Sequence, residues 1–127
     1  MSIHYRVHAR PNPQNRTAPA KYYATSVVNG TTDLDALADT ISQQCSVTPS
    51  DCYAVLIALE TNMMQELREG KSVKLGRIGS FRVSVISEGK DTAAAVTPAA
   101  MKQRKIIFKP AQAMQQMLQK LSFKKIK

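Results

Sequence analysis

The hydrophobic period of this chain changes at Gly70, and this change requires a fold that contains both helices and strands. Over residues 52–67, apolar side chains recur every three or four positions, as they do on the buried face of a helix. After Gly70, apolar and polar positions alternate in residues 73–75 and again in residues 81–86, which is typical of half-buried strands. The sequence therefore predicts the α+β class.

Two helices are expected before Gly70. The first should start near Thr31 or Thr32, because threonine can cap free amide groups, and it should end around Cys45. The second begins with the Thr-Pro-Ser-Asp segment at residues 48–51, which places a capping hydroxyl, a proline and an acid where a helix start favours them. Only a few residues join the two helices, so they should form a helix–turn–helix pair in the geometric sense.

The remaining elements are expected on either side of this pair. Residues 3–8 and 21–28 have strand-like patterns and predict a small β extension over residues 1–30. Residues 102–108 should form a third strand after an exposed loop or arm, and a short helix should open at Pro110. The basic tail, residues 124–127, is expected to fray.

Charge indicates the class of partner. The chain has 18 Lys and Arg residues against 9 Asp and Glu residues, a net charge of +9. Residues 1–60 carry a net charge of −1 and residues 61–127 one of +10. A polyanion is therefore the first partner to consider. No apolar stretch is long enough to span a membrane, and no signal peptide pattern opens the chain, so neither a membrane partner nor secretion is expected.

The chain gives little support for catalysis or metal binding. Cys45 and Cys52 form no zinc-binding pattern and fit two small buried thiols in a reducing cytoplasm. His4 and His8 fall on the polar side of the first strand, with no carboxylate beside them in sequence. We therefore predict no enzymatic activity, no catalytic or metal-binding residue, no cofactor and no small-molecule substrate.

Two segments carry a resemblance to a known family. The turn Gly76-x-x-Gly79-x-Phe81 and the later Phe108-Lys109-Pro110 stand in the order helix, helix, strand, turn, strand, arm, strand, short helix. This resembles the HU/IHF family of bacterial histone-like DNA-binding proteins over roughly residues 32–121. The segment with Tyr22-Tyr23 and the arm at residues 87–89 look more like the HU-like variant of the Bacteroidetes group, which carries an N-terminal extension.

The resemblance implies a fold and an assembly. It implies a two-helix base, a three-stranded antiparallel sheet with a β-arm and a short C-terminal helix, in an HU/IHF-like DNA-binding and dimerisation domain at residues 31–127. It also implies an intertwined homodimer, although the residues themselves do not distinguish a homodimer from a heterodimer. The apolar helix faces are large for one short chain, which agrees with burial by a partner. The expected dimerisation core is Leu37, Ile41, Val55, Leu56, Leu59, Met63, Phe81 and Phe108.

The function that follows is histone-like binding of duplex DNA in the bacterial nucleoid, with compaction or modest bending and little sequence preference. No helix presents polar groups suited to reading base edges. The residues expected to contact DNA are Arg77, Arg82, Lys90, Lys102, Arg104, Lys105 and Lys109.

The arm departs from the family pattern. Lys90 is its only cation before Lys102, and it lacks the proline-containing tip motif with which typical members kink DNA. An alternative is therefore a dimerisation or interaction protein of the HU fold whose DNA binding is weak or lost. Convergence of the Lys102–Lys105 cluster, Arg77 and Arg82 on one concave surface of the dimer would favour DNA binding, and their dispersal would favour the alternative.

Overall fold

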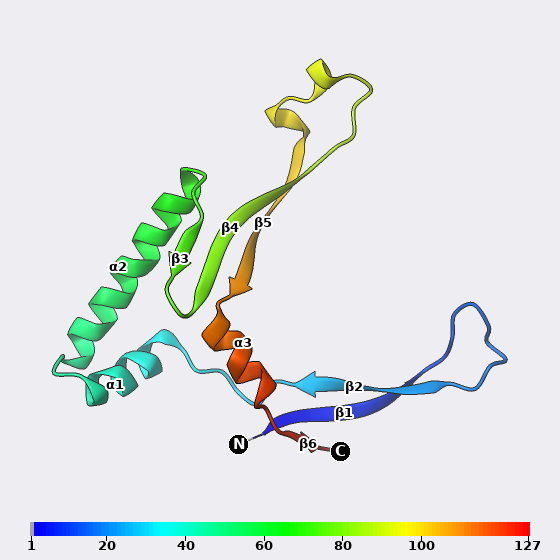
Figure 1. The fold of residues 1–127 in the computed structure, drawn as a ribbon, viewed down its shortest axis with the longest axis horizontal. Helices are drawn as coiled ribbons and strands as arrows, with labels where there is room; N and C mark the ends of the chain where they lie inside the picture. The colour runs from blue at the N-terminus through cyan, green and yellow to red at the C-terminus, as the bar shows by residue number, and fades with distance from the viewer. Residues whose placement is uncertain (1) are drawn as a thin grey trace. The chain divides into compact units, whose positions relative to one another are not determined.

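The structure, a computed structural model, describes residues 2–127, and its contacts divide the chain into two compact units. The larger unit is Leu34–Gln116, and the smaller one combines Met1–Asp33 with Met117–Lys127. The expected mixed α+β class is confirmed, with three α-helices and two sheets among the described residues (Figure 1).

The larger unit begins with two helices packed against each other, α1 (Leu34–Gln44) and α2 (Pro49–Arg68). Thr48 caps α2 as expected, because its hydroxyl oxygen accepts a hydrogen bond from the Asp51 amide at 3.2 Å. At the other end Gly70 adopts a φ of +84°, a conformation that glycine adopts without strain, and its amide donates to the Leu67 carbonyl. Local signals therefore define both ends of α2.

An antiparallel sheet completes this unit, with the strands in the order β3 (Val73–Leu75), β4 (Gly79–Ser87) and β5 (Met101–Pro110). Phe81 and Phe108 are register partners on β4 and β5, and their ring centroids lie 4.9 Å apart. Beyond the paired strands the chain forms two short 3₁₀ helices, η1 (Ala93–Ala95) and η2 (Pro98–Ala100). Helix α3 (Gln112–Gln119) follows β5.

The smaller unit is a second three-stranded sheet, in the order β2 (Lys21–Val27), β1 (Ile3–Arg10) and β6 (Phe123–Lys125). Strands β1 and β2 form an antiparallel hairpin, and β6 runs parallel to β1 on its other side. The expectation of a frayed C-terminal tail is therefore wrong. The open edge of β1 accounts for the difference, because the Ile3 amide donates to the Ser122 carbonyl at 2.8 Å and the Ile126 amide donates to the Tyr5 carbonyl at 2.9 Å.

A single copy of the chain has a very small core. Among the described residues only four apolar side chains are buried, and no large side chain is completely enclosed. The apolar side chains of α3 are not buried in one copy either, since Met117 and Leu118 are about half exposed. Much apolar surface on both units therefore remains in contact with solvent. The four buried residues are Ala38, Cys52, Leu67 and Ala100. Cys52 is therefore buried as expected, but the expectation of a buried Cys45 is wrong, because Cys45 follows the end of α1 and is exposed.

Candidate functional site

The register of the β3–β4–β5 sheet gathers cations on one of its faces. Directly paired residues of an antiparallel sheet project to the same side, and the side alternates along each strand. Ser80 pairs with Lys109, and Ser84 pairs with Lys105, so Arg82 on β4 lies between these two pairs and on their side. We call this side the basic face of the sheet. Its four cations, all exposed, are Lys74, Arg82, Lys105 and Lys109.

The opposite side of the same sheet is apolar at the end near α2. Phe81 pairs with Phe108, and Val83 pairs with Ile106. Phe81 and Ile106 also line an open apolar groove together with side chains of α2. The basic face is therefore the side of the sheet turned away from α2. The α2 residues that line the groove are Leu56, Leu59, Glu60, Met63, Met64 and Leu67.

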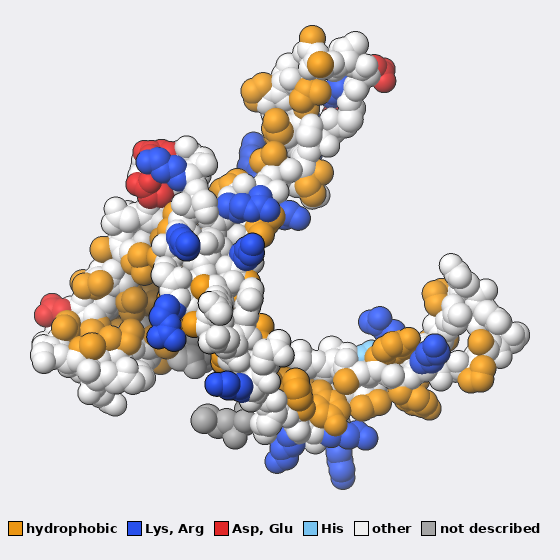
Figure 2. Space-filling view, in the orientation of Figure 1, with side chains coloured by type: hydrophobic (Ala, Val, Ile, Leu, Met, Phe, Trp, Pro, Cys, Tyr) orange, Lys and Arg blue, Asp and Glu red, His pale blue; other side chains and the backbone are white. Residues whose placement is uncertain are grey.

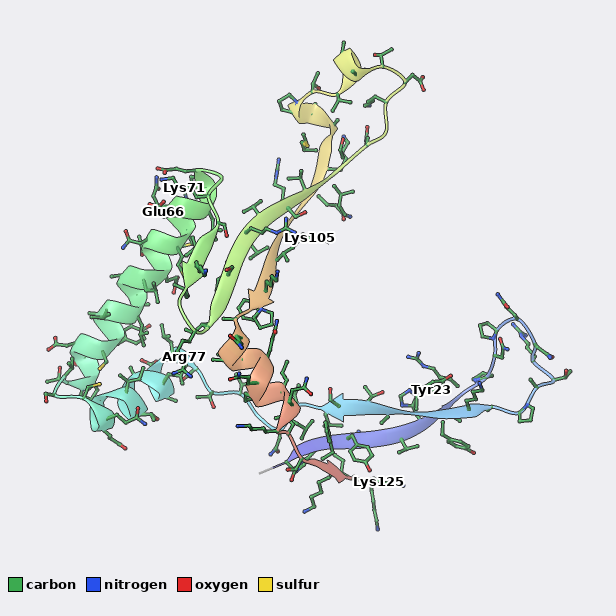
Figure 3. All side chains as sticks on the ribbon, viewed as in Figure 1. Tyr23, Glu66, Lys71, Arg77, Lys105 and Lys125 are labelled. Atoms are coloured by element: carbon green, nitrogen blue, oxygen red, sulfur yellow. The ribbon has the colours of Figure 1, made fainter. Side chains whose placement is uncertain are left out.

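Arg77 lies outside both faces, in the turn between β3 and β4. It lines a shallow groove with residues that open α3, among them Gln112 and Gln116. The Ala111 amide donates to the Ile78 carbonyl at 3.1 Å, which ties this turn to the start of α3. Arg77 therefore has a defined place beside the helix and remains exposed (Figure 3).

Three other residues of the expected DNA-binding set lie apart from the basic face. Arg104 pairs with Val85 and so projects from the apolar side of the sheet. The ammonium groups of Lys90 and Lys102 lie 2.9 Å and 3.3 Å from the carboxylate of Glu88, close to the end of the β4–β5 hairpin. Both lysines are therefore already paired with an acid, and this end of the hairpin carries little free positive charge.

Lys71 is similarly paired. Its ammonium group lies 3.3 Å from Glu66 and 3.5 Å from Glu69 (Figure 3). The hydrogen bond and the charge of Glu66, followed by the hydrogen bond of Glu69, raise the pKa of Lys71 above its ordinary value. Lys71 therefore differs from the cations of the basic face, for which the described residues provide no acidic partner.

Lys74 belongs to the basic face but was not among the residues predicted to bind DNA. It pairs with Ser80, which in turn pairs with Lys109 on the far strand, so three polar residues form one row across the sheet. The alternation of residues 73–75 showed that Lys74 points away from its apolar neighbours. The missing information was the register, which depends on the turn at residues 76–78.

None of the eight predicted dimerisation residues is buried in a single copy. Val55 is 65% exposed and Leu37 is 46% exposed, both on the helices, and Phe108 on the sheet is 45% exposed. Ile41, Leu56, Met63 and Phe81 are partly exposed, and Leu59 is 40% exposed. These side chains are available to a partner, and they include residues that line the apolar groove beside α2.

The remaining candidates for other chemistry are the histidines, cysteines and acidic residues, as possible metal ligands or catalytic groups. Residues 2–127 contain no group of three or more His, Cys, Asp or Glu side chains able to hold a metal ion. His4 and His8 lie on β1, where a ring nitrogen of His8 is 3.3 Å from the Thr25 hydroxyl. Among the described helices, none has the length and hydropathy to cross a membrane.

Comparison with known proteins agrees with this fold. A family model described as an HU domain fused to a wHTH, Ig or glycine-rich motif matches residues 1–125. No curated protein matches the chain. The solved structures include a protein of Bacteroides vulgatus, named provisionally as a bacterial DNA-binding protein, with 10% identity and a TM-score of 0.69. That match covers 98% of this chain, which spans only 48% of the longer protein.

A second solved structure is the Anabaena HU–DNA cocrystal structure. It shares 21% sequence identity with this chain at a TM-score of 0.54. The match covers 68% of this chain and 97% of the HU chain. At these identities the two structures show a shared fold.

Proposed function

This chain belongs to the HU-HIG family, and from that premise we propose that it is a histone-like protein that binds duplex DNA as a dimer, with little sequence preference. Membership confirms the resemblance to HU-type proteins drawn from the two glycine- and phenylalanine-containing segments. The assignment of residues 31–127 to the HU-like domain, and of residues 1–30 to an extension, is part of this proposal.

The observation that carries the proposal is the basic face of the β3–β4–β5 sheet. Lys74, Arg82, Lys105 and Lys109 are exposed there and share one side. Ser80 and Ser84 lie on the same side, directly opposite Lys109 and Lys105, and can donate hydrogen bonds to phosphate oxygens. Phosphates neutralised by such cations release counterions, which supplies sequence-independent affinity. We therefore assign the main phosphate contacts to these four cations. We add Arg77, which lies close to them along the chain, in the turn between β3 and β4.

The end of the β4–β5 hairpin contributes less in this proposal. Glu88 already pairs with Lys90 and Lys102, and Arg104 lies on the apolar side of its strand. The hairpin could still follow a groove of the duplex as an arm, but it lacks the free cations and the tip motif of a strong wedge. We propose modest bending or compaction of DNA in the nucleoid.

Dimerisation is supported by the exposed apolar surface. Within residues 2–127, one copy encloses no large side chain, whereas Val55 and Ile106 are 65% and 62% exposed. A second copy would remove this surface from water at about 25 cal/mol for each Å² of apolar area buried. Isologous contact between two identical faces is the commonest way in which such a surface is covered.

The test of DNA binding is the salt dependence of affinity for a labelled duplex of about 30 base pairs, measured by fluorescence anisotropy. The variant Arg82→Gln/Lys105→Gln/Lys109→Gln removes three proposed phosphate contacts from each copy. At about 0.9 for each contact, the slope of log affinity against log salt should become shallower by about 2.7 for each copy that touches DNA.

The matched control is Lys71→Gln/Lys90→Gln/Lys102→Gln, which removes the same charge from lysines that already pair with acids. It should change the slope far less. Equal effects of the two variants would contradict the assignment to the basic face. No binding of the wild-type chain at low salt would contradict DNA binding altogether.

The dimer is tested with Val55→Glu/Ile106→Glu. Both side chains are exposed in one copy, so the substitutions should destabilise a single copy little. Sedimentation should show a dimer for the wild type and a monomer for the variant. If the isolated copy unfolds, the melting temperature of the wild type must still rise with protein concentration. A wild-type monomer with a melting temperature independent of concentration would contradict the proposal.

The neutral end of the hairpin also favours a second candidate, an interaction module of the same fold without DNA binding. The two candidates share the dimer and differ in the role of the basic face. Absence of duplex binding at low salt, together with an intact dimer, is the result that would select this second candidate.

A further inference from the structure

The two units differ strongly in charge, and the difference is not visible along the sequence. The larger unit has ten Lys and Arg residues and eight acidic ones, a formal net charge of +2. The smaller unit has eight Lys and Arg residues and one acidic residue, Asp33, a formal net charge of +7. Folding therefore joins the basic C-terminal segment to the N-terminal sheet. The eight cations are Arg6, Arg10, Arg16, Lys21, Lys120, Lys124, Lys125 and Lys127.

The strand register places half of these cations on one side of the β2–β1–β6 sheet. Arg6 and Arg10 alternate on β1 with apolar residues, and Arg10 pairs with Lys21 on β2. His4 lies on the same side of β1 and pairs with Lys124 on β6. We call the side that carries Arg6, Arg10, Lys21 and Lys124 the N-terminal basic face. Figure 2 shows Lys and Arg side chains beside a histidine on the β1–β2 hairpin.

The other side of this sheet is apolar. Ile3 and Tyr5 on β1 line an open groove with Ala24 and Ser26 of β2 and with Phe123 of β6. Because side chains alternate across a strand, this groove and the N-terminal basic face lie on opposite sides of the sheet. The charged side is therefore a separate surface, free of large apolar side chains other than Tyr23 and Val27.

Nothing among the described residues neutralises the N-terminal basic face. The strands β1, β2 and β6 contain no acidic residue. The ion pairs of the described residues belong to Lys71, Lys90 and Lys102, all in the larger unit. The four cations of the face are exposed. They are consequently available to an external anion, unlike the paired lysines at the end of the β4–β5 hairpin.

Side chains next to these cations can orient them and supply further hydrogen-bond donors. The guanidinium carbon of Arg10 lies 5.9 Å from the centroid of the Tyr23 ring, a cation–π distance. The Thr25 hydroxyl lies 3.3 Å from Nδ1 of His8 on the same side of the sheet. Hydroxyl and imidazole groups beside fixed cations suit phosphate oxygens, which accept hydrogen bonds and carry charge.

We propose that the N-terminal basic face is a second binding surface for the phosphate backbone of duplex DNA. From His4 to Arg10 the strand extends about 20 Å, at about 3.3 Å for each residue. A duplex of that length carries about 12 phosphates, at one charge for each 1.7 Å or so. A protein partner would instead require aromatic or aliphatic anchors at the centre of its interface, which this face largely lacks. The inference rests on the proposed function only in taking duplex DNA as the ligand.

The test uses the full chain and two variants with equal loss of charge in the same unit. The face variant is Arg6→Gln/Arg10→Gln/Lys21→Gln/Lys124→Gln. The control variant is Arg16→Gln/Lys120→Gln/Lys125→Gln/Lys127→Gln, which leaves the face intact. Lys125 pairs with Tyr5 on the apolar side of the sheet, and the other three residues lie outside its strands (Figure 3). Binding of a duplex of about 30 base pairs is measured by anisotropy over a range of salt concentrations.

The face variant should make the slope of log affinity against log salt shallower by up to about 3.6 for each copy, from four contacts at about 0.9 each. The control variant should stay close to wild type. A milder variant, Arg6→Gln/Lys124→Gln, should lower the slope by about 1.8 and keeps the test valid if the fourfold variant does not fold. Far-ultraviolet circular dichroism shows which variants are folded.

The outcomes separate this inference from the proposed function. An effect of the face variant, with none from Arg82→Gln/Lys105→Gln/Lys109→Gln, would support the second surface and contradict the assignment of the main phosphate contacts to the basic face of the β3–β4–β5 sheet. A face variant that binds like wild type would overturn the second surface and leave the proposed function standing. Equal effects of the face and control variants would also overturn it, because net charge and not the face would then determine binding.

Discussion

Gly79, the first residue of β4, adopts a conformation that only glycine adopts readily, and its replacement should destabilise the sheet that carries the basic face. Its φ is +151°. A Cβ atom added there would overlap the backbone carbonyl oxygen of Lys109 and lie 2.6 Å from Cε1 of Phe108. Because the first of these neighbours is backbone, β4 and β5 would have to separate locally to admit a methyl group.

The cost of Gly79→Ala follows from these two effects. A non-glycine residue in such a region of φ costs about 1–3 kcal/mol, and overpacking adds about 1–3 kcal/mol. We therefore expect a loss of about 2–6 kcal/mol in the free energy of unfolding. Gly76 is the matched control, since its φ is +46° and no atom lies within 4 Å of an added Cβ. Gly76→Ala should cost only the conformational term, about 1–2 kcal/mol.

Urea denaturation followed by circular dichroism measures both variants, at one protein concentration because the proposed dimer makes stability depend on concentration. Gly79→Ala should unfold at a clearly lower urea concentration than Gly76→Ala. If Gly79→Ala were no less stable than Gly76→Ala, the close approach of β4 and β5 at Gly79 would be contradicted.

Three further predictions concern charge and capping. Thr48→Ala removes the hydroxyl that accepts from the Asp51 amide and should cost about 1 kcal/mol in urea denaturation; an unchanged midpoint would contradict the cap. Glu88→Gln frees Lys90 and Lys102 from their ion pairs and should tighten duplex binding and steepen its salt dependence; weaker binding would show that Glu88 serves the hairpin in another way. Glu66→Gln should lower the pKa of Lys71 towards its ordinary value, since Glu66 is the main cause of the rise, and an NMR titration of the Lys71 side chain measures it. Because that pKa is raised in the folded chain, protonated Lys71 favours folding at neutral pH, and this contribution is lost as the pH rises through the raised value.

Sequence signals were most informative where structure is set locally. The capping threonine at 48, the proline after it and Gly70 define the ends of α2 within a residue or two. The alternation after Gly70 likewise predicted the strands of the larger unit. These features depend on neighbours within one turn or one strand, which a single sequence contains.

The C-terminal strand could not be predicted in this way. β6 has three residues and pairs with β1, about 120 positions away. Its pattern, Phe-Lys-Lys, resembles a solvated tail, and only the open edge of β1 makes it a strand. The same pairing places the lysines of residues 117–127 in the unit of the N-terminal sheet. The net charge of each sequence half therefore differs from the net charge of each folded unit.

The candidate site was partly accessible from the sequence. Alternation along one strand is enough to place Arg104 on the side opposite to Lys105 and Lys109, and the register agrees. Lys74 joins the basic face only through the register across the β3–β4 turn. The pairing of Glu88 with two lysines depends on how the chain closes the hairpin beyond the paired strands. Side-chain partners across a loop have no sequence spacing that identifies them.

The most direct test of the central claim is DNA crosslinking from each side of β4. Ser84 pairs with Lys105 on the basic face, whereas its neighbour Val85 projects from the opposite side. A photoreactive group is attached to Ser84→Cys or Val85→Cys, with the exposed Cys45 first replaced by serine. Val85 is the more exposed of the two positions, so accessibility alone would favour crosslinking from position 85. The account predicts strong crosslinking to duplex DNA from position 84 and little from position 85, and the reverse result would contradict it.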